Sequence, residues 1–420
     1  MRLALLAGHD PRHIAASRQI ALGACADVVL SAGTERSASF VERAEAIREA
    51  RPDVVLLVAD DRGADHAVEL AEALRLATVA QQPRPAVLVS TDERTHARVE
   101  LSLGHAVEAF GDVRSADVRA AVVARLRAMA RGASDARLRD EGIEQAARTL
   151  AASSSRSIAI LDVTGTSTSL VVARADGTLI AAHVPLGVGE HADRVVARAG
   201  LDRVRRWIPR AIDAPALLER VFNRAHWPDV PATNSLALEI ELALARECVS
   251  RVLAEATRAE LPLAHAARHA DTIACTGRLA TWKPSQTALV ALDALAPESA
   301  SVIARETQDA PLAAGGTALE PLTLVAPVSV RRSATVHVTD ATGTVDERVG
   351  RGAFVLLRTT GAVQLAGDGA TRASSDPLSM GVIVDARGRP LELPPRDAER
   401  LPTIQRWYGA LDALPSGDDA

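Results

Sequence analysis

The feature that most restricts the fold is a series of short apolar runs that alternate with amphipathic segments over the first 130 residues. The clearest run, residues 53–58, reads Asp-Val-Val-Leu-Leu-Val. An unbroken run of this kind is typical of a strand that is buried on both faces of a parallel sheet. Segments of about ten or more residues with helical spacing lie between such runs. This alternation predicts a doubly wound α/β domain at residues 1–131.

The rest of the chain divides into four expected parts. Residues 132–156 are polar and compatible with a helix, and three consecutive serines lie near their end, which favours a linker. Residues 157–320 carry strands, a long helical region and a last strand followed by helices to about residue 306. Short β segments with Gly and Asp between them predict a small β-rich module at 321–398, and a C-terminal helix and tail follow at 399–420. The individual strands are expected at 3–7, 26–31, 53–58, 85–90, 157–163, 169–174, 179–184 and 271–277, and the helices at 11–23, 37–50, 65–77, 192–210, 214–223 and 235–258.

The charge and composition argue against several classes of function. The 48 basic and 53 acidic residues leave a net charge of −5, which gives no general attraction to nucleic acid or to an anionic membrane. Aromatic residues are 2% of the chain, too few for stacking platforms that bind single-stranded nucleic acid. No apolar run approaches the roughly 18–20 residues that span a bilayer. We therefore expect a soluble, cytoplasmic protein without nucleic-acid or membrane partners.

Several catalytic motifs are absent from the sequence. Lys283 is the only lysine, so the chain has no P-loop of the type that ends in Gly-Lys-Ser/Thr. Neither Gly-x-Ser-x-Gly nor His-Glu-x-x-His occurs, so hydrolase and zinc-enzyme functions lack support. Cys25, Cys248 and Cys275 lie far apart in apolar settings, which predicts buried thiols in a reducing compartment.

The strongest functional signal is the segment 161–169, Leu-Asp-Val-Thr-Gly-Thr-Ser-Thr-Ser, between two expected strands. A buried strand that ends in Asp162 and turns through Gly165 into hydroxyl residues forms a small polar cup. Its backbone N–H groups and hydroxyls can hold phosphate oxygens, and the aspartate can hold hydrated Mg²⁺. The alternative is a plain β-hairpin, in which the same residues satisfy β propensity and turn hydrogen bonds.

This segment resembles the second phosphate-binding segment of the MutL (GlmL) proteins, which are accessory proteins of cobalamin-dependent glutamate mutase. Those proteins belong to the superfamily of actin-like and sugar-kinase ATPases. Similar segments are 23–29, 51–57, 206–209, 239–246 and 288–297, and the most specific is 381–391, Gly-Val-Ile-Val-Asp-Ala-Arg-Gly-Arg-Pro-Leu. The resemblance implies an actin-like ATPase half-domain of the ribonuclease-H-like type. It also implies a chaperone-like accessory protein that contacts mutase subunits.

The resemblance further implies ATP or GTP with Mg²⁺ as the ligand. Asp162 would be the Mg²⁺ ligand. The residues that would face the nucleotide are Asp162, Gly165, Thr166, Ser167, Thr168, Thr276 and Gly277.

The chain departs from the family pattern at several positions. Family members open with a Gly-Ser-Thr loop for the β- and γ-phosphates, whereas this sequence begins about where their next region starts. One glycine of their second segment is Thr164 here, whose Cβ penalises close backbone approach. The acid that closes their second segment is replaced by Ser169. Arg278 stands in the adenosine loop, where it could obstruct a purine or stack on it. Because phosphoryl transfer needs charge stabilisation from both sides, we expect weak or no ATPase activity.

Three other loops carry charge. Asp385, Arg387 and Arg389 fit a clamp for an anion or for a partner's carboxylate, and equally a structural Asp–Arg turn. The segment 8–10, Gly-His-Asp, fits a helix N-cap better than an anion site. The pair 60–61, Asp-Asp, fits a solvated loop better than a Mg²⁺ site. The cobalamin motif Asp-x-His-x-x-Gly does not occur, so we expect no cobalamin ligand and place the five histidines of the first domain at the surface.

Two functions remain compatible with the sequence. The first is an accessory or reactivating protein for a cobalamin-dependent mutase that binds nucleotide with weak or no hydrolysis. The second is a nucleotide-free, degenerate scaffold of the same family. A third function, a small-molecule kinase of the same fold, lacks a residue that would serve as the base.

Overall fold

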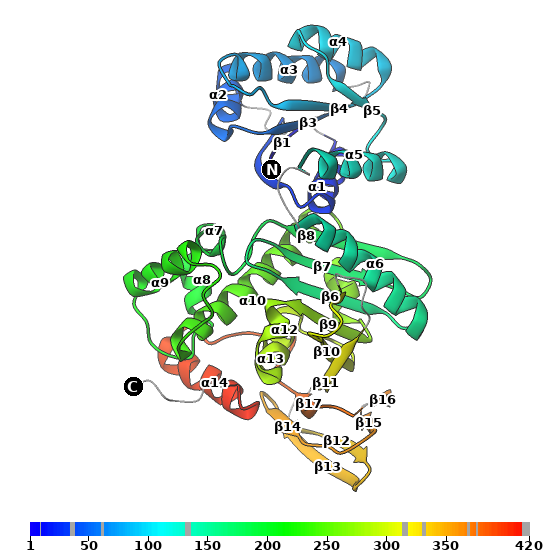
Figure 1. Ribbon diagram of the computed structural model, residues 1–420, viewed down its shortest axis with the longest axis vertical. Helices are drawn as coiled ribbons and strands as arrows, with labels where there is room; N and C mark the ends of the chain where they lie inside the picture. Colours follow the sequence, from blue (N-terminus) through cyan, green and yellow to red (C-terminus); the bar gives the residue numbers. More distant parts are fainter. Residues whose placement is uncertain are drawn as a thin grey trace. The chain divides into compact units, whose positions relative to one another are not determined.

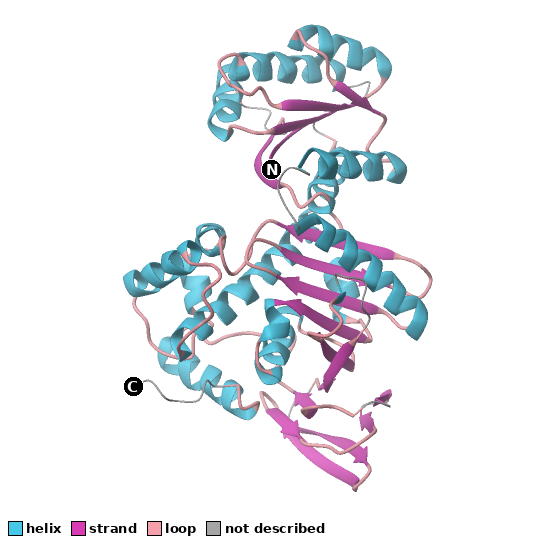
Figure 2. Ribbon diagram, in the orientation of Figure 1, coloured by secondary structure: helices cyan, strands magenta, loops and turns pink. Residues whose placement is uncertain are grey.

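The computed structural model describes residues 1–8, 10–33, 38–59, 63–130, 136–312, 318–329, 333–367, 370–374 and 377–413 (Figures 1 and 2). The chain forms two units, which we treat separately. The first unit comprises residues 1–137 with 182–184 and 254–261, and the second comprises 138–181, 185–253 and 262–420.

The first unit alternates strands and helices as the sequence predicts. Its elements are β1 (Arg2–Ala7), α1 (Pro11–Gly23), β2 (Asp27–Ala32), α2 (Phe40–Ala50), β3 (Val54–Val58), α3 (Ala64–Thr78), β4 (Ala86–Ser90), α4 (Glu93–Leu103), β5 (Glu108–Phe110) and α5 (Ala116–Met129). The five strands are parallel, in the order β2-β1-β3-β4-β5. This is the doubly wound order of flavodoxin-like domains, and it confirms the expected fold class.

The apolar run of β3 explains why this sheet is covered on both faces. Every residue of β3 is buried, and neighbouring residues point to opposite sides. Val55 and Leu57 pack with the residues of α2, α3 and α4, whereas Leu56 packs with those of α1 and α5. The short strand β5 was not predicted, because three residues are too few for a recognisable period.

The charged segment 8–10 leads into the first turn of α1. The side chain of Asp10 accepts a hydrogen bond from the N–H of Arg12, so this residue is the N-cap of α1. The expectation of surface histidines is wrong for His13, which is 2% exposed and lies between Asp10 and Asp112. His9 and the pair 60–61 lie outside the described residues.

The remaining elements begin after residue 135. They are α6 (Ala136–Ser154), β6 (Ile158–Val163), β7 (Thr168–Ala173), β8 (Leu179–Val184), α7 (Ala192–Ala199), α8 (Leu201–Arg205), α9 (Ala214–His226), α10 (Ser235–Arg258), α11 (Leu263–Arg268), β9 (Thr272–Gly277), α12 (Arg278–Thr281), α13 (Pro284–Leu295), β10 (Ser301–Glu306), β11 (Leu319–Pro327), β12 (Ser333–Asp340), β13 (Gly343–Gly350), β14 (Phe354–Leu357), β15 (Val363–Gly367), β16 (Ala370–Ser374), β17 (Gly381–Asp385) and α14 (Asp397–Ala410).

The large sheet of the second unit has eight strands, in the order β14-β17-β11-β10-β9-β6-β7-β8. β6 is antiparallel to β7 and parallel to β9, and β9 is parallel to β10. The five strands β8-β7-β6-β9-β10 therefore have the ribonuclease-H-like arrangement that the resemblance implies. Figure 2 shows these strands side by side. The mixed α/β class with parallel strands is confirmed for this unit as well.

The C-terminal β region is divided between two sheets. β11, β14 and β17 extend the large sheet beyond β10. The other strands form a second, four-stranded sheet in the order β13-β12-β15-β16. The expected module at 321–398 therefore contributes to the main sheet and also forms a sheet of its own.

Three local expectations differ from the structure. Residues 136–154 of the expected linker form α6, which buries Ile143, Ala147 and Ala151 against β6 and β7. Residues 301–306 form the strand β10 instead of ending a helical region. The expected helix 192–210 is interrupted at Gly200, whose φ is 93°. Within the described part of the chain, no helix is long and apolar enough to cross a membrane.

Candidate functional site

The site lies at the edge of the large sheet where β6 and β9 end and β7 begins. β6 and β9 are parallel, so their carboxyl ends lie at the same edge, and Asp162 is the register partner of Thr276. Ser169 of β7 is opposite Asp162 on the other side. The structure thus brings the aspartate, Thr276 and Gly277 together, as the resemblance implies.

The carboxylate of Asp162 is buried and fully engaged by other side chains. Its exposed fraction is 0%. Nη2 of Arg139 donates to Oδ1 at 2.7 Å, and Nε donates to Oδ2 at 3.0 Å. The hydroxyl of Thr276 also donates to Oδ1, at 2.6 Å. Burial would lower the pKa of Arg139, but the hydrogen bonds and charge of Asp162 outweigh it and raise that pKa.

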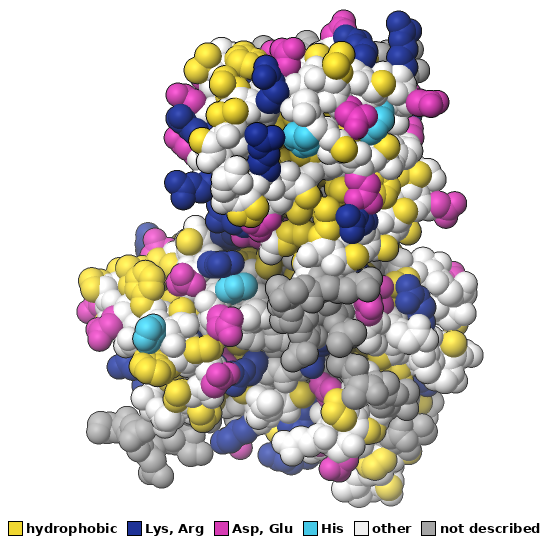
Figure 3. All heavy atoms as spheres, turned by 45° about the horizontal axis from the view of Figure 1, so that its top comes forward, with side chains coloured by type: hydrophobic (Ala, Val, Ile, Leu, Met, Phe, Trp, Pro, Cys, Tyr) yellow, Lys and Arg dark blue, Asp and Glu magenta, His cyan; other side chains and the backbone are white. Residues whose placement is uncertain are grey.

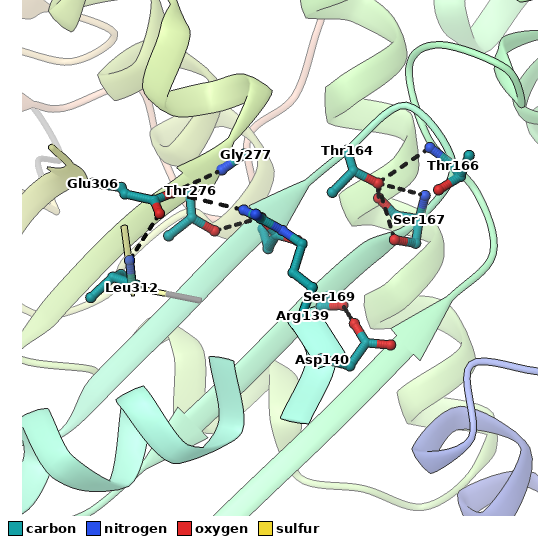
Figure 4. A network of polar contacts seen from close by, with 11 residues as sticks. Arg139, Asp140, Thr164, Thr166, Ser167, Ser169, Thr276, Gly277, Glu306 and Leu312 are labelled. Atoms are coloured by element: carbon teal, nitrogen blue, oxygen red, sulfur yellow. Dashed lines mark hydrogen bonds and ion pairs between the residues drawn. The ribbon is translucent and has the colours of Figure 1, made fainter. Parts of the chain in front are cut away.

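A second carboxylate lies on the other side of the guanidinium. Figure 4 shows Arg139 pointing toward Thr276 and Glu306. Oε2 of Glu306 is 3.8 Å from Nη2 of Arg139 and accepts a hydrogen bond from the N–H of Gly277 at 3.4 Å. Its other oxygen accepts the N–H of Leu312 at 2.9 Å. The guanidinium therefore lies between two acids, at the position next to Asp162 where the resemblance implies a metal ion.

Sequence reasoning missed both Arg139 and Glu306. Arg139 lies in the segment that was expected to be a linker, and Glu306 ends the strand that was expected to be helix. A signal for Arg139 does exist in the sequence. Buried Ile143 lies four residues later, so the two share one face of α6. An amphipathic helix over 136–154 would have placed the arginine toward the sheet.

The hydroxyl residues of the hairpin satisfy one another. Oγ1 of Thr164 accepts the N–H groups of Thr166 and Ser167, at 3.2 and 2.9 Å. The Oγ atoms of Thr164 and Ser167 are 3.0 Å apart. The hydroxyl of Thr164 therefore occupies two backbone N–H donors that a phosphate would need. The glycine of the family pattern has no side chain at this position and would leave both donors available.

The next two residues turn their hydroxyls inward. The hydroxyl of Thr168 donates to the carbonyl of Leu186 at 2.7 Å. The hydroxyl of Ser169 donates to Asp140 at 2.9 Å. Thr168 and Ser169 are both 0% exposed. Their contacts are those of a structural hairpin, the alternative left open by the sequence.

A neighbouring segment covers the hairpin at Gly165. The N–H groups of Val188 and Gly189 donate to the carbonyls of Thr164 and Gly165, at 2.9 and 3.0 Å. A Cβ at Gly187 would lie 2.5 Å from the carbonyl oxygen of Thr164, so this position requires glycine. A Cβ at Gly165 would meet its nearest atom at 3.7 Å, an ordinary contact.

The adenosine-loop position shows one feature that fits the resemblance and one that does not. Gly277 has a φ of 66°, and a Cβ there would lie 2.4 Å from the carbonyl oxygen of Val163. The close approach of the two strand ends therefore requires this glycine. Arg278 is directed elsewhere, since its Nη2 donates to the carbonyl of Pro228 at 2.7 Å.

The charged loop after β17 lies mostly inside the protein. Asp385 and Arg387 have side chains that are 0% exposed, and they are paired at 2.9 Å. Arg387 also pairs with Asp293 at 2.8 Å, and it lies over the ring of Phe354. Arg389, which is paired with Asp385 at 2.9 Å, is partly exposed. These contacts are those of a structural Asp–Arg turn.

The residues near Asp162 do not fit a Mg²⁺ ion in this arrangement. Mg²⁺ requires oxygen ligands in near-octahedral geometry, whereas both oxygens of Asp162 already accept from a guanidinium. Among the described residues, no group of three or more His, Cys, Asp or Glu side chains could hold a metal ion.

Comparisons with known proteins add little. No model of a known protein family matches the chain, and no curated protein sequence matches it. One of the solved structures similar to it is the crystal structure of an exopolyphosphatase-like protein, at 13% identity and a TM-score of 0.18. The alignment covers 57% of this chain and 58% of that one, so the chain spans less than two thirds of that protein. At this TM-score the likeness supports no conclusion about function.

Proposed function

We propose that this protein is a nucleotide-independent accessory protein that acts through protein contacts, and that its partner is a subunit of a cobalamin-dependent mutase. The observation that carries the first part is the pairing of Arg139 with Asp162. The second part rests on the resemblance to the MutL proteins, above all at residues 381–391. The competing function is an accessory protein of the same kind that depends on Mg²⁺-ATP or Mg²⁺-GTP.

The charge beside Asp162 opposes the binding of a metal–nucleotide complex. A guanidinium remains protonated at all physiological pH values, so Arg139 supplies a permanent positive charge beside Asp162. A Mg²⁺ ion would have to displace this charge from the carboxylate and would be repelled by it. The closed hydroxyl network of Thr164 also occupies backbone donors that a phosphate would need. The cup is therefore complete without a ligand.

The partner can be tested with purified subunits of a cobalamin-dependent glutamate mutase. The chain is immobilised, and binding of each subunit is measured with and without Mg²⁺-ATP. We expect one subunit to bind with the same affinity under both conditions. Binding that requires nucleotide would contradict the proposal, and binding of no subunit would remove the mutase as the partner.

A variant separates the two parts of the proposal. Asp162→Asn retains the volume of the side chain but removes the charge that a metal ion needs. Where this variant still folds, as judged by circular dichroism, it should bind the mutase subunit like the natural protein. An accessory protein that depends on nucleotide would lose its partner in this variant.

A further inference from the structure

A pocket lies between two helices of the second unit, next to the segment that covers the hairpin, since Nε of its lining residue Arg224 donates to the carbonyl of Val188 at 3.1 Å. It has a volume of about 290 Å³. The end of α9, the loop 227–234 and the first turns of α10 line it. All of its lining residues lie between 220 and 241, so a single continuous stretch of chain forms the pocket.

The pocket is bordered by apolar side chains that are unusually exposed. Trp227 is 62% exposed and Val230 49%. Of the four tryptophans of the chain, Trp207, Trp282 and Trp407 are buried, whereas Trp227 is exposed at this pocket. Figure 3 shows hydrophobic side chains gathered at the left edge of the molecule, on the side where Figure 1 places α9. Exposed tryptophan is among the residues that contribute most to protein interfaces.

The acid among the lining residues is paired, whereas one of the lining cations is not; the exposed Asp229 lies in the same loop but is not a lining residue. The inner acid Glu241 is paired with Arg224 at 2.8 Å. Nearby Glu239 is paired with Arg210 at 2.6 Å. Arg220 also lines the pocket, is exposed, and has no hydrogen bond or ion pair with any residue that the structure describes. It lies one helical turn before Arg224, whose charge is compensated by Glu241, so Arg220 supplies the free positive charge of the lining.

The size of the pocket restricts its occupant. Pockets for small molecules have volumes of about 300–1,000 Å³, so this pocket is at the lower limit of that class. Its volume suits one bulky apolar side chain, with the surrounding exposed residues as a contact rim. The charge of Arg220 on that rim is complementary to an acidic residue next to such a side chain.

We infer that the α9–α10 pocket is a docking site for a partner protein that inserts a bulky apolar side chain flanked by Asp or Glu. This inference deepens the proposed function, because an accessory protein that acts through contacts needs such a surface. It assigns the tryptophan as the apolar anchor of the rim and Arg220 as the residue that selects acidic partners.

The test uses the full chain and labelled nine-residue peptides. The central residue is leucine or tryptophan, and the flanking residues are glutamates, lysines or serines. Affinity is measured by fluorescence polarisation at two salt concentrations. We expect the glutamate peptides to bind most tightly and to weaken with salt, and the lysine peptides to bind least. Equal affinity for all three sets would overturn the inference.

Two variants locate the binding. Trp227→Ala should lower the affinity for the glutamate peptides about 30-fold, the effect expected when a central interface residue is removed. Arg220→Glu should reverse the preference, so that the lysine peptides bind more tightly. The matched controls are Leu101→Ala, an apolar residue that is 84% exposed, and Arg174→Glu, an exposed arginine at the end of β7. Peptide binding that changes as much in the controls would contradict the assignment.

Two further outcomes would also overturn the inference. A dimer that forms with concentration and is lost in Trp227→Ala would assign the surface to a second copy of the chain. If the protein instead binds none of the peptides but binds a small carboxylate such as indole-3-acetate tightly, that result would assign the pocket to a small molecule. Failure of the peptides leaves the nucleotide independence of the proposed function unaffected, because that is measured separately by titration with Mg²⁺-ATP.

Discussion

The guanidinium of Arg139 is held by both oxygens of the Asp162 carboxylate, at 2.7 Å to Oδ1 and 3.0 Å to Oδ2. The arginine comes from α6, and the aspartate comes from the end of β6. The pair therefore fastens a helix to the edge of the sheet, at the acid that the sequence resemblance implies to be a Mg²⁺ ligand. Its consequences for stability and ligand binding can be measured.

The first prediction concerns the stability of the second unit. Arg139→Ala leaves a buried, unpaired carboxylate, which we expect to lower the free energy of unfolding by about 3 kcal/mol. All four tryptophans, Trp207, Trp227, Trp282 and Trp407, lie in this unit, so tryptophan fluorescence in urea reports on it alone.

The matched control lies on the same helix. Arg148 is 46% exposed and pairs with Glu144 across one turn at 3.8 Å. Because exposed ion pairs contribute little, Arg148→Ala should change the free energy of unfolding by about 0.5 kcal/mol or less. Equal effects of the two variants would show that Arg139 does not hold the buried acid.

The second prediction compares two glycines of the hairpin region. Gly187→Ala places a Cβ 2.5 Å from backbone atoms of the hairpin and should lower the free energy of unfolding by about 3 kcal/mol. Gly165→Ala meets only ordinary contacts and should cost about 1 kcal/mol or less. If the hairpin were a phosphate loop, Gly165→Ala would impair ligand binding more than Gly187→Ala does.

The third prediction concerns acid stability. Burial alone would raise the pKa of Asp385, but the charges of Arg387 and Arg389 outweigh it and lower this pKa from 3.8 to about 2. Since the pKa is lower in the folded state, the stabilisation is complete above about pH 4 and is lost as the pH falls toward 2.

Asp385→Asn should therefore lower the free energy of unfolding at pH 7 by about 2 kcal/mol, and its difference from the natural protein should shrink between pH 4 and about 2. Urea unfolding at a series of pH values measures this. Asp309→Asn, at an exposed aspartate, serves as the control. A difference that stays constant with pH would contradict the depressed pKa.

The fourth prediction concerns thiol reactivity. Burial raises the pKa of Cys248 and of Cys275 to about 12, whereas Cys25 is only partly buried. Because the thiolate is the reactive form, we expect one rapidly reacting thiol in the native protein at pH 8 and three in urea. Mass spectrometry after a short exposure to iodoacetamide identifies the residue. Rapid labelling of Cys248 or Cys275 in the native protein would contradict the burial of β9 and α10.

The strands were the most predictable part of the structure. β3 and most of β6 are continuous apolar runs, and β9 has a shorter one, Ile-Ala-Cys, before its closing glycine; the sequence alone locates all three strands to within one residue. α10 was predicted with its full length for a related reason, because a capping segment and a Pro-rich break precede it. The resemblance added the ribonuclease-H-like class of this part of the chain.

The parts that were missed depend on contacts between distant residues. The role of α6 was missed because its surface is polar and only one narrow face, with Ile143 and Ala147, is buried. β10 was missed because its six residues include two charged ones. Membership of β11 and β17 in the large sheet follows from pairing across more than fifty residues, which no local pattern records.

The candidate site illustrates the same limit. The sequence locates Asp162, Thr276 and Gly277 at strand ends, because apolar runs define those ends. It does not show that Arg139, from a helix 23 residues earlier, reaches the acid. That contact depends on how α6 docks on the sheet, and it changes the chemistry of the site from an open metal ligand to a closed ion pair.

The most direct test of the account is calorimetric titration of the natural protein with Mg²⁺-ATP and Mg²⁺-GTP. Asp162→Asn and Arg148→Ala serve as controls for the site and for α6. Because the guanidinium of Arg139 occupies the carboxylate, we predict no heat of binding for either nucleotide in any of the three proteins. Binding to the natural protein and to Arg148→Ala that disappears in Asp162→Asn would contradict the account.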